Sequence, residues 1–212
     1  MALTATATRQ SRQDICRTLG MTKPVVVSQS PNKPNITYEL SVKRETVEET
    51  LAPLVEQLRR ERNIMDRVLI FCQKYDDVTH IYHFMRSRLG KESYHPVGAP
   101  NLVKYRLFDM FTACTHPTVK EGIVSAFTNT NSPLRIVVAT IAFGMGLDCP
   151  NIRKVFHWGP PSDIESYLQE TGRAGRDGAQ ATAILYYNKT DLRAQHIEDS
   201  VKAYCRNTEH TL

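Results

Sequence analysis

The sequence contains no long hydrophobic run. No stretch approaches the roughly 18 apolar residues of a membrane-spanning helix, and the opening MALTATATRQ lacks the basic segment and apolar core of a signal peptide. Cysteine is scarce and scattered, because the five cysteines of the 212-residue chain never form a CxxC pair. This spacing disfavours both a disulfide framework and a zinc site. We therefore expect an intracellular protein with reduced thiols, no bound metal and no membrane partner.

Neither of the common phosphate-binding motifs is complete. The pattern GxxxxGK followed by Ser or Thr does not occur, and Cys149 stands where a GxGxxG pattern starting at Gly144 would need its third glycine. The chain therefore holds no complete mononucleotide cradle. Its net charge of +5 is compatible with an acidic partner such as nucleic acid, although so small an excess also fits an ordinary solvated surface.

The hydrophobic pattern alternates between strand-like and helix-like segments. Runs rich in β-branched residues predict strands over residues 24–29, 36–42, 67–73, 134–140, 154–159 and 181–187. Amphipathic stretches between them predict helices over residues 9–19, 46–62, 76–89, 117–128, 162–171 and 190–204. We therefore predict an α/β fold with a doubly wound, mainly parallel sheet, whose ligands lie beyond the carboxyl ends of the strands.

Composition indicates the domain boundaries. Proline, asparagine and serine concentrate in SQSPNKPN, which predicts a linker at residues 31–35. Residues 1–30 are too few to bury their own apolar faces, so we expect the C-terminal remnant of another domain. Residues 36–190 form the main domain, and residues 191–212 form a helix that leads out of it. Within the main domain, residues 98–117 are long for a connection and apolar enough to suggest a packed insertion.

Two arginines lie three positions apart in the glycine-rich segment QETGRAGRDG. Arg173 and Arg176 carry permanently charged planar groups that suit phosphate oxygens, and the glycines around them, Gly172 included, would let a polyanion or a second domain come close. We place Gly172 and both arginines at a bound nucleotide. The alternative is a surface loop whose arginines pair with Glu170 and Asp177.

The segment before these arginines predicts a short amphipathic helix. Ser162 and Glu165 have the spacing of a capping box, and the apolar residues after them share one helix face. Whether the helix ends before or after Gly172, a spacing of three can aim both arginines to one side.

A second polar segment follows the predicted strand 134–140. Gly144, Gly146 and Asp148 come shortly after the strand, where a doubly wound fold keeps its site. Asp148 could accept hydrogen bonds from a ribose hydroxyl, and Thr140 could hold a nucleic-acid phosphate.

Four segments closely resemble motifs III, IV, V and VI of the RecQ family of DNA helicases. In chain order they are ALTATAT, VLIFCQ, RIVVATIAFGMGLDCPNIRKVFHW and PPSDIESYLQETGRAGRDG. The resemblance implies an ATP-driven motor that translocates 3′ to 5′, unwinds DNA and has two RecA-like domains with ATP in the cleft between them. Residues 1–30 then correspond to the end of the first RecA-like domain, and residues 36–190 correspond to the second.

The resemblance also implies roles for single residues. Thr4 and Thr6 belong to the element that couples ATP hydrolysis to DNA. Gln169, Arg173 and Arg176 belong to the motif that completes the ATP site across the cleft, where one arginine acts as a finger on the γ-phosphate. We favour Arg176 for this finger, and Arg173 is the alternative.

Several parts of the family's machinery do not occur in the sequence. The P-loop lysine, the DExH carboxylates and the aromatic-rich loop are absent. We therefore expect ATP with Mg²⁺ to be bound mainly by a first domain that this chain lacks, and the chain alone to be inactive. Zinc is expected only in a region downstream of residue 212. The arginine of the family's RPN sequence is Lys33 here, which keeps the charge and loses the planar fork.

The resemblance finally indicates partners and setting. We expect two partners: DNA, single-stranded or forked, and the first RecA-like domain. The resemblance implies a role in repair and recombination. In a eukaryote it implies a nuclear protein. The alternative is a non-enzymatic module, derived from a helicase, that binds DNA or another partner. His80 and His83 share a helix face, but no third ligand has suitable spacing, so we expect a solvated role.

Overall fold

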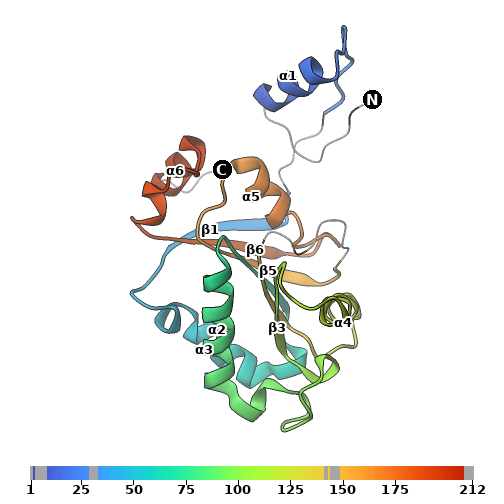
Figure 1. Cartoon of the computed structure of the whole chain (residues 1–212), viewed down its shortest axis with the longest axis vertical. Coiled ribbons are helices and arrows are strands. Elements are labelled where there is room, and N and C mark those ends of the chain that lie inside the picture. Colours follow the sequence, from blue (N-terminus) through green and yellow to red (C-terminus); the bar gives the residue numbers. More distant parts are fainter. Residues whose placement is uncertain (1, 3–8, 29–32, 141–142, 144–148, 208–212) are drawn as a thin grey trace.

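The structure is a computed structural model that describes residues 2, 9–28, 33–140, 143 and 149–207. Helices and strands alternate along the chain (Figure 1). The α-helices are α1 (Arg9–Thr18), α2 (Val47–Glu61), α3 (Tyr75–Leu89), α4 (Pro117–Thr128), α5 (Ile164–Thr171) and α6 (Asp199–Arg206). The strands are β1 (Ile36–Val42), β2 (Arg67–Cys72), β3 (Phe108–Phe111), β4 (Ile136–Ala139), β5 (Ile152–Trp158) and β6 (Ala181–Tyr187).

All these strands belong to one sheet of order β1-β6-β5-β2-β4-β3, and every pair of neighbouring strands is parallel. The central strands β2 and β4 are buried along their whole length. A parallel sheet is covered on both faces by its crossover helices, so its inner strands are apolar on both sides. The predicted α/β fold with a doubly wound parallel sheet is confirmed.

The helices form two layers around this sheet. Apolar side chains of α2 and α3 pack against Val68 and Ile70 on one face. On the other face, α4 packs against Leu69 and Phe71, and α5 and α6 pack around Leu185 of β6. Successive residues of β2 therefore face opposite layers, as the two-residue period of a strand requires.

Three predicted segments differ in the structure. The described part of segment 24–29 forms no strand, and Val25 and Val27 are 92% and 93% exposed. A strand needs a neighbour to pair its backbone groups, and no described strand lies beside this segment. The predicted helix 190–204 is replaced by a 3-10 turn at Asp191–Arg193 followed by α6.

Segment 98–117 is more than an insertion, because it contains the edge strand β3, which pairs with β4. This strand has only four residues, and one of them is the buried Asp109. Arg106 donates a hydrogen bond of 2.6 Å to the Asp109 carboxylate. A charged residue in so short a run conceals the apolar pattern by which a strand is found in a sequence.

Helix α1 lies beyond α5, away from the sheet (Figure 1), where Ser11 donates a hydrogen bond of 2.7 Å to Glu165. None of the described helices combines the length and apolar character that crossing a membrane requires.

Candidate functional site

Helix α5 presents the two arginines, and Asp163 caps its first turn. The Asp163 carboxylate accepts hydrogen bonds from the backbone N–H of Ser166 at 2.6 Å and from the Ser166 hydroxyl at 2.8 Å. The predicted capping box of Ser162 and Glu165 is therefore wrong by one residue: Ser162 donates to Asp163, and Glu165 accepts from Ser11. An aspartate satisfies the free N–H groups of a first turn as well as a serine does.

The helix ends at Thr171 and continues into the arginine loop, which we define as residues 172–180. Two further turn hydrogen bonds, from Arg173 N to Glu170 O and from Ala174 N to Thr171 O, carry the chain just past the helix end. The backbone then reverses at Gly175, whose φ is +56°. Gly172 is part of this turn, at the C-cap of α5.

The two arginines lie in different surroundings. Arg173 is 9% exposed, whereas Arg176 and Gln169 are exposed. Burial and the nearby charge of Arg176 lower the pKa of the Arg173 guanidinium. Burial and the same Arg176 charge also lower the pKa of Lys33. Three cations therefore lie near one another at the end of α5, where Lys33 donates to the carbonyl of Gly172.

The acidic residues of the motif are engaged by other partners. Arg153 grips the Asp177 carboxylate through both of its terminal nitrogens, and this holds the pKa of Asp177 at about 2. Glu170 is buried and lies 2.8 Å from Nε2 of the buried His157. The alternative interpretation, in which Arg173 and Arg176 pair with these two acids, thus fails for Asp177. Glu170 interacts with Arg173 only electrostatically, so for this acid the alternative interpretation is correct only to that extent.

Two residues of the predicted linker form hydrogen bonds with the backbone of the arginine loop. Lys33 Nζ donates to the carbonyl of Gly172 at 2.6 Å, and Asn35 Nδ2 donates to the carbonyls of Gly175 and Ala179 at 2.8 Å each. Sequence reasoning assigned these residues no contact with the loop. Nothing local could have revealed one, because the partners lie 139 to 144 positions apart.

The arginine loop lies at the amino ends of the strands, not at their carboxyl ends. Gly175 N donates to the carbonyl of Ile152, the first residue of β5, and Ala181 N donates to the carbonyl of Asn35, just before β1. The two arginines therefore do not lie beyond the carboxyl ends of the strands, which is where we expected ligands. A crossover helix starts at the carboxyl end of one strand and returns the chain to the amino end of the next.

Thr140 lies at the opposite edge, directly after β4, and its N–H donates to the carbonyl of Phe111 at 3.3 Å. The structure therefore does not bring Thr140 together with Arg173 and Arg176. The remaining predicted site residues lie outside the described residues: Thr4, Thr6, Gly144, Gly146 and Asp148.

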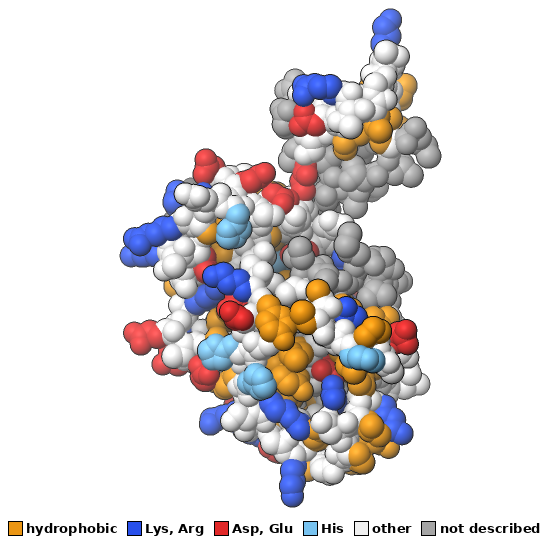
Figure 2. Space-filling view, in the orientation of Figure 1, with side chains coloured by type: hydrophobic (Ala, Val, Ile, Leu, Met, Phe, Trp, Pro, Cys, Tyr) orange, Lys and Arg blue, Asp and Glu red, His pale blue; other side chains and the backbone are white. Residues whose placement is uncertain are grey.

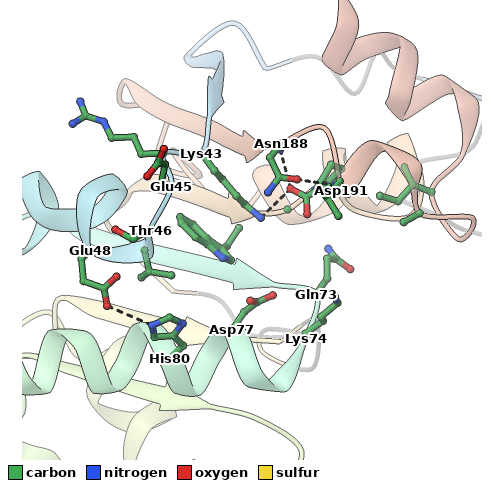
Figure 3. A pocket seen from close by; sticks show the side chains of 18 of the residues that line it. Lys43, Glu45, Thr46, Glu48, Gln73, Lys74, Asp77, His80, Asn188 and Asp191 are labelled. Atoms are coloured by element: carbon green, nitrogen blue, oxygen red, sulfur yellow. Dashed lines mark hydrogen bonds and ion pairs between the residues drawn. The ribbon is translucent and has the colours of Figure 1, made fainter.

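A cavity of about 420 Å³ opens on this carboxyl edge, at the ends of β1, β2, β5 and β6 (Figure 3). Lys43 lies 3.0 Å from Asp191 and 4.8 Å from the centre of the Trp158 ring, so its charge is already engaged. Lys74 is exposed at the start of α3, next to Gln73. Figure 2 shows acidic and basic side chains interspersed over the visible face. An anion would therefore be attracted by a local cluster of basic side chains, because charges of one sign do not cover that face.

Two glycines of the arginine loop provide a matched test of its packing. Both have positive φ, but a Cβ on Gly175 would lie 2.4 Å from Asn35 Nδ2, whereas a Cβ on Gly178 would meet nothing within 4 Å. We expect Gly178→Ala to lower the free energy of unfolding by about 1 kcal/mol through backbone strain, and Gly175→Ala by about 3 kcal/mol because Asn35 must also move. Urea unfolding of the two variants checks this prediction, and equal losses would contradict it.

Known proteins resemble this chain over most of its length. Residues 46–178 match the family model of the helicase conserved C-terminal domain. The ATP-dependent DNA helicase RecQ of Pasteurella multocida is 36% identical over 197 residues, which cover 92% of this chain and 27% of that protein. The human ATP-dependent DNA helicase Q4 is 34% identical over 187 residues, covering 88% of this chain and 15% of that protein. The chain thus spans about a quarter or less of the length of these two relatives.

A solved structure shows the same fold. S. cerevisiae Dbp5 bound to RNA and ADP BeF3 is similar with a TM-score of 0.67 at 16% identity, over 97% of this chain and 49% of that chain. The parallel six-stranded sheet is accordingly that of RecA-like helicase domains. The RecQ resemblance of the motifs is confirmed by the relatives, and the chain belongs to the helicase conserved C-terminal domain family, among its RecQ-type members.

Proposed function

We propose that this chain supplies the trans half of the ATP site of a RecQ-type helicase. The observation that carries this proposal is the convergence of Lys33, Arg173 and Arg176 at the end of α5. Exposed Arg176 reaches the γ-phosphate of ATP, and buried Arg173 supports it. Gln169 is exposed near the end of α5, just before the arginine loop, and joins them at the nucleotide in this proposal. Gly144, Gly146 and Asp148 complete the nucleotide side.

The residues present fit the phosphates of a nucleotide better than its metal ion. The loop carries two guanidinium groups and Lys33 adds an ammonium group beside it, while the one carboxylate of the loop, Asp177, is held by Arg153. Among the residues that the structure describes, no group of three His, Cys, Asp or Glu side chains could hold a metal ion. We therefore assign Mg²⁺ and most of the nucleotide to a first RecA-like domain, and zinc to a region further downstream.

The chemistry follows from charge. Phosphoryl transfer spreads negative charge over the transferred oxygens, and an arginine delivered by a second domain contributes about 10³- to 10⁵-fold in rate. Because this arginine arrives only when the two domains close, hydrolysis becomes coupled to domain movement. That coupling drives 3′ to 5′ translocation and unwinding of DNA in the proposed enzyme.

We assign nucleic acid to the opposite, carboxyl edge of the sheet. Thr140 follows β4 there, and Lys74 follows the neighbouring strand β2 at the uncapped start of α3. The lysine and the helix start, which has no side-chain cap, suit a backbone phosphate, although Asp76 and Asp77 in the first turn oppose it. Thr4 and Thr6 would join this path from the first domain. The fold neighbours Dbp5 and Mycobacterium smegmatis Lhr were solved with RNA and with single-stranded DNA, which supports nucleic acid as a partner in the proposal.

The 212-residue chain alone is expected to turn over no ATP, with or without DNA. Joined to a first RecA-like domain that carries a P-loop and DExH motif, it is expected to gain DNA-stimulated turnover. Phosphate release by the two proteins, measured side by side with and without single-stranded DNA, checks both statements. If the joined protein folds and binds DNA but gains no turnover, the non-enzymatic module becomes the better interpretation. Turnover by the chain alone would contradict the trans-site assignment.

A further inference from the structure

We propose that Lys33 and Asn35 are positioning residues for the arginine loop, so that the segment before β1 sets where Arg173 and Arg176 lie. This inference rests on the proposed function of the loop as a reader of nucleotide phosphate. It assigns a specific task to a segment that the sequence presents only as a linker.

Asn35 fastens the turn of the loop at two points. Its side-chain amide donates to the carbonyls of Gly175 and Ala179, which lie on either side of Arg176 in the chain. Its backbone carbonyl accepts from Ala181 N at the start of β6. The close fit at Gly175, where a Cβ would lie 2.4 Å from the Asn35 amide, shows that the loop and the segment pack tightly. The exposed Arg176 is therefore carried on a turn whose two ends are held by one side chain.

Lys33 fastens the other end of the loop. Its Nζ donates to the carbonyl of Gly172, one of the carbonyls that a helix end leaves without an internal partner. The Lys33 ammonium also lies close enough to Arg176 for the arginine's charge to lower its pKa. Lys33 thus serves the loop in two ways: the hydrogen bond fixes the backbone, and the charge adds to the cluster that an anion would meet.

These contacts connect the loop to the chain that precedes the domain. The carbonyl of Lys33 accepts from Ile36 N, which fixes the segment against the first residue of β1. Pro34, with its restricted φ, stands between the two contacting residues. If the segment before β1 moves, the three hydrogen bonds of Lys33 and Asn35 move the arginine loop with it. The segment that precedes β1 and the arginine loop are thus in direct contact.

Hydrogen exchange on the 212-residue chain tests the positioning role without any ligand. We expect backbone amides of residues 173–178 to exchange about tenfold faster in Asn35→Ala, because two hydrogen bonds to the loop are lost. Amides of the central strands β2 and β4 should be unchanged. The matched control is Asn131→Ala, an exposed asparagine outside the arginine loop. Loop exchange at the wild-type rate in both Asn35→Ala and Lys33→Met would overturn the inference.

Binding of inorganic tripolyphosphate, measured by calorimetry, separates the two tasks of Lys33. Lys33→Gln keeps a donor for Gly172 and loses the charge, so we expect slow loop exchange with about threefold weaker binding. Lys33→Met loses both, so we expect faster exchange and about tenfold weaker binding. If ATP turnover of the protein joined to a first RecA-like domain survives both Arg176→Ala and Arg173→Ala, the proposed function fails. The exchange measurement still decides the positioning role in that case. If the wild-type chain binds and only Arg176→Ala weakens binding, the positioning role fails and the proposed function stands.

Discussion

Replacing Arg176 by alanine is expected to lower ATP turnover by about 10³-fold or more in a protein that joins this chain to a first RecA-like domain. Affinity for single-stranded DNA is expected to stay within about twofold of the wild type. The reason is the placement of the side chain: Arg176 is exposed on the arginine loop at the amino edge of the sheet, whereas Thr140 and Lys74 lie at the carboxyl edge. Removing the guanidinium therefore removes charge from the proposed ATP site and leaves the proposed DNA path intact.

Steady-state phosphate release and fluorescence anisotropy with a labelled DNA strand measure the two effects. Arg60→Ala is the matched control, because Arg60 is an exposed arginine on α2 that pairs with Glu61. Arg176→Lys tests the planar fork, since a lysine keeps the charge and cannot hold two phosphate oxygens at once. Turnover that survives in Arg176→Ala and disappears in a folded Arg173→Ala would transfer the finger role to Arg173.

Removal of the buried Glu170 carboxylate is expected to have a large effect on stability. Glu170→Ala should lower the free energy of unfolding by about 3 kcal/mol, because it leaves the Nε2 of a fully buried histidine without its partner. Among the described residues, His157 Nδ1 has no hydrogen-bond partner, so this ring depends on Glu170 for its polar contact. The His157 ring is also fixed between Phe71 and Tyr167, with ring centres 5.5 and 5.0 Å away.

Thermal and urea unfolding measure this loss, which corresponds to a fall in Tm of about 6 to 12 °C for a chain of this size. Glu170→Gln is the matched control, because the amide oxygen can still accept from Nε2 and most of the stability should remain. The double variant His157→Phe with Glu170→Leu should lose less than the sum of the two single changes, since it removes both polar groups together. Equal stability of Glu170→Ala and Glu170→Gln would contradict this account.

The His157 contact also bears on function, because Glu170 directly precedes the end of α5 and the arginine loop. A strand residue thereby fixes the helix that carries Gln169, and the loop that follows inherits its position. The sequence marks Glu170 only as a nearby acid of the motif. Its actual partner is His157 of β5, which lies 13 positions earlier. No local sequence pattern predicts that this histidine is buried.

The sequence determined the element types over most of the chain. Hydrophobic periodicity located α2, α3 and α4 to within a residue or two, and apolar runs located β1, β2 and β6. The pattern failed where burial depends on a distant neighbour, as at Val25 and Val27, and where a charge interrupts a short strand, as at Asp109. The motif resemblance to RecQ helicases came from the order of residues alone, and the relatives confirm it.

Tertiary structure alone decided how the arginine loop is held and where it lies. Capping and i, i+3 spacing act within one or two helical turns. They therefore predicted that α5 leads to Arg173 and Arg176. They could not predict which distant residues form hydrogen bonds with the loop. The contacts of Lys33 and Asn35 join positions 139 to 144 residues apart. They exist because β1 pairs with β6 at Ile36 and Ala181, which brings the segment before β1 against the loop before β6. The same pairing of strands places the arginines at the amino edge of the sheet, with Arg173 buried and Arg176 exposed.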